Sequence, residues 1–292
     1  MKYLHTLLAF LSTPWAIERE KYEIVRALLL ERAAGIGPTP EQIEAATDAR
    51  RTAAGYTQAG KVAIIPIMGV IAHRVGMMER SSGGISTEAI GRQVDAAVED
   101  KTVSKIVLQI DSPGGSVAGV TELAAKIRAA REEKKVIAVA DATAASAAYW
   151  LGSQASEFYA TPSGRVGSIG VIAEHVDDTA AREKVGYKST LITAGKYKGE
   201  GYGPLTDEAA QRLQADVDHY YDLFVSDVAK GRGVSESAVR NGYGEGRALV
   251  AAEAKAAGMI DGIASFETVL RRLSVTLTPE AMRARARAVE IS

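Results

Sequence analysis

Short apolar runs alternate along the chain with stretches whose apolar residues recur at helical spacing. Three runs, at 62–67, 106–110 and 136–140, are continuous enough to predict strands buried on both faces of a parallel sheet. Between them, residues 90–98 and 120–127 each place apolar side chains on one helical face. Repeated strand–helix units of this kind predict an α/β domain with parallel strands and right-handed crossovers.

Shorter elements follow residue 140. A helix rich in small residues is expected from about Ala145, and a long helix from Thr206, its N-cap, to Gly231. The predicted core face of the long helix consists of Leu213, Val217, Tyr220, Phe224 and Val228. The other predicted elements are strands at 157–160, 169–173 and 188–193 and helices at 177–185, 234–241 and 247–258.

The two ends of the chain depart from this alternation. Residues 1–35 predict an arm of two short helices, and residues 36–60, which contain Gly-Pro-Thr-Pro and several glycines, predict a linker. The α/β domain is expected over residues 61–273, and residues 274–292 form a basic tail with an arginine-rich helix.

Composition and charge narrow the function classes. The 292 residues include 35 basic and 36 acidic side chains, and this balance argues against a general nucleic-acid binder. The absence of cysteine excludes disulfides and thiolate nucleophiles, and the four histidines lack metal-ligand spacing, so we expect no metal and no cofactor. No apolar run reaches the ~18 residues of a membrane span. The N-terminal apolar run is broken by polar residues, which favours a cytoplasmic location over a secretory signal.

Three loops at predicted strand ends carry candidate chemistry. In the first, Asp111-Ser-Pro-Gly-Gly-Ser116, two glycines follow a proline between a buried strand and a helix. Such a turn can present N–H groups to an oxyanion or a phosphate. The spacing is not that of a nucleotide-binding loop, so an oxyanion hole is the functional hypothesis. A tight strand-to-helix turn is the structural alternative.

The second loop, residues 144–150, places Ser146 at a helix start among alanines. Its hydroxyl is suited to attack a substrate carbonyl, with the Ala147 N–H directed at the developing oxyanion. The alternative is that Ser146 only caps the helix.

The third loop, residues 195–202, holds Lys196 and Lys198 between glycines. A lysine in such a loop is either a solvated charge or a base kept neutral inside a cleft. The second role requires the lysine pKa to fall from ~10.4 to about 7–8, mainly through desolvation. A serine–lysine pair needs no histidine, which suits this composition.

Four segments in this order resemble the signal peptide peptidase A family of serine peptidases. They are Asp111-Ser-Pro-Gly-Gly-Ser116, Ala145-Ser-Ala-Ala-Tyr149, Gly167-Ser-Ile-Gly-Val171 and Gly195-Lys-Tyr-Lys198. The resemblance covers about residues 60–270. It implies a Clp-protease/crotonase-like α/β fold, a spiral of ββα units.

The same resemblance implies the roles of single residues. Ser146 is the nucleophile and Lys198 the general base, with Lys196 as the rival base, and Ser168 orients the lysine amine. The expected oxyanion hole consists of Gly114, Gly115 and Ala147. The expected substrate groove is lined by Ser116, Val117 and Tyr149. An extended peptide would pair with the 114–117 edge, with a small or medium apolar residue before the scissile bond.

The N-terminal segment Leu11-Ser-Thr-Pro-Trp-Ala-Ile17 is similar to the soluble bacteriophage branch of the family, the head maturation (prohead) proteases. That similarity implies cleavage of scaffold and portal proteins, and of the chain itself, inside an assembling capsid in the host cytoplasm. The chain departs from the family at Ala147-Ala148, where glycines are usual, and at Gly199, and we expect no membrane anchor. We therefore do not expect signal peptides as the substrate. Apolar faces on the last helices and the rings typical of the family suggest a homo-oligomer.

Several alternatives stay open from the sequence. His175, with Asp177 or Asp178, could act as the base in the manner of Clp-type peptidases. The chain could also be a cytoplasmic signal-peptide-peptidase-like protease that degrades peptides, a crotonase-type acyl-CoA enzyme, or an inactive capsid-associated scaffold.

Overall fold

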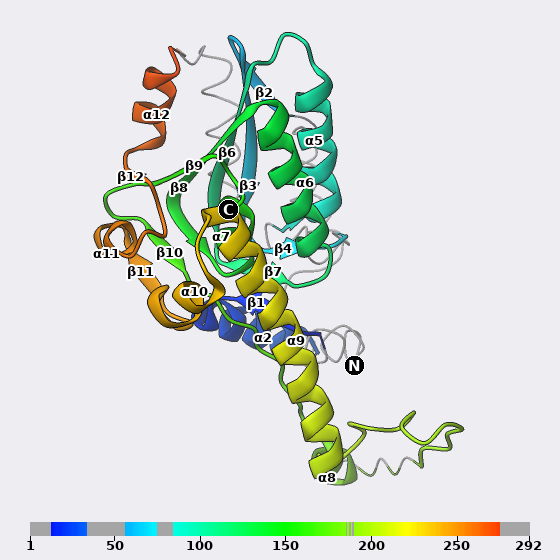
Figure 1. The fold of residues 1–292 in the computed structure, drawn as a ribbon. Coiled ribbons are helices and arrows are strands. Elements are labelled where there is room, and N and C mark those ends of the chain that lie inside the picture. The colour runs from blue at the N-terminus through cyan, green and yellow to red at the C-terminus, as the bar shows by residue number, and fades with distance from the viewer. Residues whose placement is uncertain are drawn as a thin grey trace.

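A computed structural model describes residues 13–33, 56–74, 84–184, 186, 188 and 190–274 (Figure 1). The first predicted arm helix, most of the predicted linker and nearly all of the basic tail lie outside the described residues.

The predicted apolar runs form the centre of the fold. Strands β3 (Val62–Met68), β6 (Lys105–Ser112) and β8 (Lys135–Ala145) pair in parallel. The sheet has the order β11-β10-β8-β6-β3-β2, and β9 and β12 branch from β8. Its shorter strands are β2 (Thr57–Ala59), β9 (Glu157–Ala160), β10 (Arg165–Gly167), β11 (Ala248–Val250) and β12 (Gly262–Ile263). This confirms the predicted α/β class.

Helices cover the sheet because its central strands are apolar on both faces. Helices α5 (Thr87–Glu99) and α6 (Val120–Glu133) lie side by side in Figure 1 and bury their apolar stripes in the main core. On the other face, α12 (Phe266–Arg272) packs on Val107 and Val139. The remaining helices of this part of the chain are α7 (Ala147–Gly152), α10 (Glu236–Gly242) and α11 (Ala251–Ala256).

A second, smaller sheet joins the N-terminal arm to the first candidate loop. Its order is β1 (Trp15–Ile17), β7 (Gly114–Ser116), β4 (Ile71–Ala72) and β5 (Ile85–Ser86). The arm continues as helix α2 (Arg19–Ala33), which confirms one of its two predicted helices. The strand at residues 15–17 was not expected in an arm predicted to be helical. The large side chains flanking Ala16 favour an extended backbone, and the edge of β7 supplies the partner.

Four other expectations are corrected. Residues 169–173 form no strand, since only Ile172 makes an isolated bridge, and the strand of this region is β10. Residues 188 and 190–193 are not in a strand. Strand β2 lies inside the predicted linker, so the sheet begins before residue 61. A single helix was expected at 247–258. Its first part is strand β11, and only α11 is helical.

Helix α9 (Asp207–Arg232) divides the molecule into two regions. Phe224 and Val228 near its C-terminus are buried as predicted, whereas Leu213 and Val217 are only half-buried. Figure 1 shows the N-terminal half of α9 and α8 (Thr179–Lys184) projecting away from the sheet. We call α8, residues 190–205 and the first half of α9 (207–221) the extension, and the rest of the described chain the body.

Candidate active site

Ser146 lies between the end of β8 and the start of α7, at the carboxyl edge of the parallel sheet. Its backbone has φ 54° and ψ −120°, a combination that non-glycine residues rarely adopt. The side chain makes no capping bond to α7, and its Oγ instead donates to the Gly170 carbonyl at 3.5 Å. The helix-cap interpretation of Ser146 is therefore wrong. A strained residue with its hydroxyl released from capping is typical of a functional site.

The Gly-Gly turn lies directly against this serine. Gly114 has φ 101°, and a Cβ there would lie 2.2 Å from the Ala16 carbonyl oxygen and 3.0 Å from Ser146 Cβ. A Cβ on Gly115 would lie 1.8 Å from the Ile71 carbonyl oxygen. Both positions therefore require glycine, and the structure brings the first two candidate loops together.

Two further segments complete the surroundings of Ser146. Ala147 is the first residue of α7, so its N–H has no carbonyl partner within that helix. The Ser146 N–H donates to the Gly167 carbonyl at 2.6 Å, which places Ser168, at φ 53° and half-buried, next to the serine backbone. The sequence interpretation included the segment Gly167-Ser-Ile-Gly-Val171 but assigned a role only to Ser168, and it missed the contacts of the Gly167 and Gly170 carbonyls with Ser146.

The three residues expected to line a substrate groove have different environments. Ser116 and Val117 are buried beneath the arm, with Ser116 paired to Trp15 and the Val117 N–H donating to the Pro14 carbonyl at 3.4 Å. Tyr149 lies in the core, where its hydroxyl donates to the Met259 carbonyl at 2.9 Å and burial raises its pKa. A groove role therefore does not fit Tyr149.

The two candidate lysines lie on the extension and differ in their contacts. The Lys196 amine contacts the Tyr197 hydroxyl and pairs with Glu208 at 3.5 Å. Lys198 is exposed, and no hydrogen bond or ion pair joins its amine to a described residue. Within one chain, no bond connects Lys198 to Ser146 or Ser168.

The histidine alternative has its side chains engaged elsewhere. His175 Nε2 contacts the Gly203 carbonyl at 2.9 Å. Asp177 accepts hydrogen bonds from the Thr179 N–H and hydroxyl, and these bonds lower its pKa. Neither side chain bonds to Ser146, so the geometry disfavours a Ser–His–Asp triad in this chain.

Comparison with known proteins supplies the family. A family model described as "Peptidase family S49" matches residues 128–278. The chain belongs to peptidase family S49. The α/β architecture of this family S49 member agrees with the Clp/crotonase-like fold that the resemblance implied.

Two phage proteins are among the relatives of this chain. It is 34% identical over 205 residues to "Head-tail preconnector protein GP5" of Enterobacteria phage P21, covering 70% of this chain and 41% of the relative. It is 34% identical over 194 residues to "Capsid assembly protease C" of Escherichia phage lambda, covering 66% and 44%. A putative protease of Methanocaldococcus jannaschii is 31% identical over 182 residues, covering 62% and 58%. The chain thus spans less than half the length of the two phage relatives.

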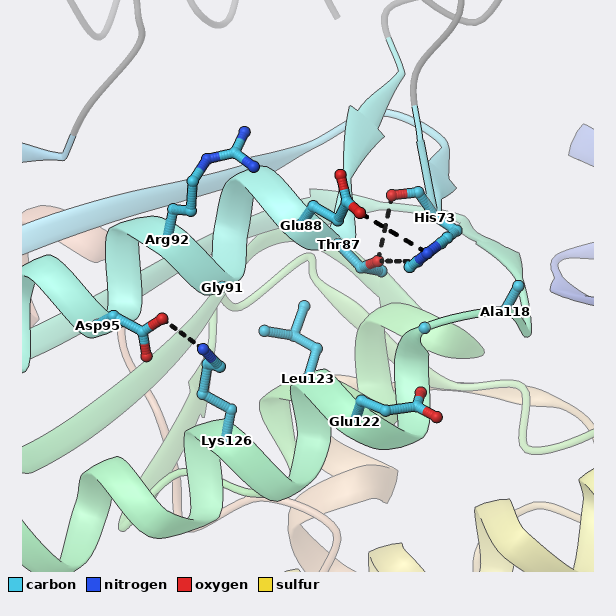
Figure 2. Close-up of a pocket in the computed structure, with 11 residues that line it drawn as sticks. His73, Thr87, Glu88, Gly91, Arg92, Asp95, Ala118, Glu122, Leu123 and Lys126 are labelled. Carbon is cyan, nitrogen blue, oxygen red and sulfur yellow. Dashed lines mark hydrogen bonds and ion pairs between the residues drawn. The ribbon is translucent and has the colours of Figure 1, made fainter.

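A hollow of about 660 Å³ lies between α5 and α6 (Figure 2). It is bordered by His73 and Glu88 at one end and by the ion pair of Lys126 with Asp95 at the other. None of the predicted site residues lines it. Among the described residues, no acidic or histidine cluster could hold a metal, and no helix is long and apolar enough to cross a membrane.

Proposed function

We propose that this chain is a serine endopeptidase in which Ser146 is the nucleophile and Lys198 the general base. The observation that carries the proposal is the backbone of Ser146, held at φ 54° against Gly114 with its hydroxyl not used for capping. Ser146 Oγ attacks the substrate carbonyl, and the N–H groups of Gly115 and Ala147 stabilise the oxyanion. The lysine amine takes the serine proton and then donates it to the leaving amine. Water hydrolyses the acyl-enzyme by the reverse transfer.

Lys198 is the preferred base because Lys196 pairs with Glu208 and His175 is bound to Gly203. Its exposure on the extension means that the neutral amine needs a second surface to exclude water. Large apolar side chains are exposed on the same segment. They are Leu191, Ile192, Tyr197, Tyr202 and Leu205.

A second copy of the chain supplies that surface in our proposal. The extension of one copy covers the Ser146 site of another, where Ser168 orients the arriving amine. The exposed apolar side chains then become buried in a homo-oligomer. The lysine amine is shielded from water at the same contact, and desolvation lowers the pKa of a lysine.

The biological substrates in this proposal are polypeptides of an assembling phage capsid: scaffold protein, portal protein and the chain itself. Support comes from the names of the two phage relatives, one a capsid assembly protease and the other a head–tail preconnector protein. The proposed place of action is the host cytoplasm, within the assembling capsid.

The test is hydrolysis of an unfolded protein substrate by purified variants. We expect Ser146→Ala and Lys198→Ala each to lose at least about 10³-fold in kcat/KM. Lys196→Ala and His175→Ala are the matched controls and retain hydrolysis. Loss in His175→Ala with full activity in Lys198→Ala would contradict the assignment of the base.

Covalent labelling by a fluorophosphonate supplies a second measurement. Labelling confined to Ser146 separates a peptidase from an acyl-CoA enzyme of the same fold, which needs no serine nucleophile. A chain that neither labels nor hydrolyses under any condition would be a scaffold rather than an enzyme.

A further inference from the structure

Strand β1 of the arm lies along the edge of β7 where a substrate peptide is expected. The register pairs Ala16 with Gly115, and the bonds on either side are Glu18 N–H to Pro113 carbonyl, 2.8 Å, and Val117 N–H to Pro14 carbonyl, 3.4 Å. Hydrogen-bonded and non-bonded pairs alternate in an antiparallel ladder, so the Ala16–Gly115 pair between these two is a hydrogen-bonded one. The Gly115 N–H, the proposed oxyanion donor, therefore points at the Ala16 carbonyl.

The opposite edge of β1 is also bonded. Trp15 and Ile172 exchange both of their N–H to carbonyl bonds at 2.8 Å. The arm is thus held as an extended strand between two backbone segments, which is how many proteins bind extended peptides by strand addition.

The Ala16 carbonyl and Ser146 both lie next to Gly114. A Cβ on Gly114 would be 2.2 Å from that carbonyl oxygen and 3.0 Å from Ser146 Cβ. Ala16 and Ser146 are both 0% exposed. No substrate reaches this serine while the site stays covered to this extent.

Side chains along β1 alternate between two environments. Ala16 packs into the main core, while Trp15 and Ile17 pack with Tyr22 and Leu29 of α2 in a separate cluster. The space at position 16 therefore accepts a small side chain.

Polar side-chain contacts hold the arm against the segment around Ile172, which bonds to the outer edge of β1. Glu174, two residues after Ile172, accepts a hydrogen bond from the Tyr22 hydroxyl at 3.0 Å and pairs with Arg26 at 3.1 Å. Burial and the bond to Glu174 raise the pKa of Tyr22. Arg165 also lies 3.9 Å from Glu18 of the arm. β1 is the edge strand of the second sheet, so its departure would leave β7, β4 and β5 paired.

We propose that residues 14–18 occupy the peptide-binding groove as a substrate-like strand, with Ala16 at the position whose carbonyl Ser146 attacks. The groove takes extended peptides with a small residue at that position, and the arm blocks it until displaced. This inference rests on the proposed peptidase function. Lys198 is not beside Ser146 within the chain, so the Ala16–Ile17 bond is held rather than cut in this state.

A reversible disulfide between β1 and β7 tests whether the arm blocks the groove. Trp15 and Ser116 form a non-hydrogen-bonded pair, the kind in which opposite Cβ atoms are closest, and the chain has no other cysteine. In Trp15→Cys/Ser116→Cys, oxidation should lower hydrolysis and fluorophosphonate labelling at least about 10-fold relative to the reduced form. Wild type treated with the same reagents is the control. Equal rates in the two redox states would overturn the proposal.

Peptide binding tests the occupancy without catalysis. In a Ser146→Ala background, Ala16→Arg should displace the arm, and Ile24→Arg, at a 59% exposed position of α2, is the matched control. A fluorescent peptide Thr-Pro-Trp-Ala-Ile-Glu should bind the Ala16→Arg chain at least about 10-fold more tightly than the control. Equal binding to both chains would overturn the proposal.

The two proposals fail in different ways. If the peptide binds as expected but no variant hydrolyses substrate, the peptidase function fails and the groove assignment stands. If hydrolysis depends on Ser146 and Lys198, but the disulfide does not lower it and Ala16→Arg does not tighten peptide binding, the groove assignment fails alone.

Discussion

The body and the extension of this molecule carry the two halves of the proposed catalytic pair in opposite environments. Ser146 is completely buried in the body, where β8, the Gly-Gly turn and α7 fix its backbone. Lys198 is exposed on the extension, close in sequence to Ile192, which is 92% exposed. The difference teaches that one chain fixes the backbone around the proposed nucleophile but leaves the proposed base exposed to solvent.

The junction between the two regions is itself well packed. The rings of Trp150 and Phe224 stack with centroids 4.4 Å apart, and Trp150 Nε1 donates to Asp227 at 3.0 Å. Arg128 lies 3.4 Å from the same carboxylate. The extension is therefore anchored firmly at its base, although its outer part lacks a packing surface within the described chain.

The largest effect is expected from mixing two inactive variants, which tests whether Ser146 and Lys198 come from different copies of the chain. Ser146→Ala retains the extension and Lys198→Ala retains the nucleophile, so a mixed oligomer contains complete sites if the pair forms between copies. We expect hydrolysis at least about 10³-fold above either variant alone after mixing and reassembly. No recovery in oligomers shown to be mixed would mean that the pair forms within one chain.

A glycine substitution in the body should have the next largest effect. Gly114→Ala combines a positive φ with a contact of 2.2 Å to the Ala16 carbonyl, and we expect a loss of about 3 kcal/mol in the free energy of unfolding. Gly233→Ala, at φ 66° with no atom within 4 Å of the new Cβ, should cost about 1 kcal/mol. Urea denaturation measures both. Equal losses would show that β1 does not lie against Gly114.

A substitution on the extension should barely change the stability of the single chain. Ile192→Ser removes an apolar side chain that makes little contact there, so the free energy of unfolding should shift by less than about 0.5 kcal/mol. Hydrolysis and oligomer mass should fall together, as measured by activity assay and light scattering. Unchanged mass and activity would indicate that this part of the extension faces solvent in the working enzyme.

The body was largely predictable from sequence because its signals are local. Apolar runs at 62–67 and 106–110 could only be buried strands once helical stretches flanked them, and the structure has β3 and β6 there. The meeting of Gly114 with Ser146 followed from two loops at the carboxyl ends of neighbouring parallel strands. Their close contact is visible only in three dimensions.

The arm and the extension were less predictable because their conformations depend on distant partners. Residues 15–17 form a strand only because the edge of β7 lies beside them, and no spacing within the arm encodes that. Residues 190–193 are apolar enough for a strand, yet no strand of the described sheets pairs with them.

Helix α9 runs without interruption for 26 residues, about 39 Å at the usual rise. With its C-terminal part fixed in the body, it acts as a spacer of set length and rotation. Each residue inserted into or deleted from its outer half would turn everything beyond by about 100° and move it by about 1.5 Å. The geometry of any assembly built through the extension is thereby tied to the length of one helix.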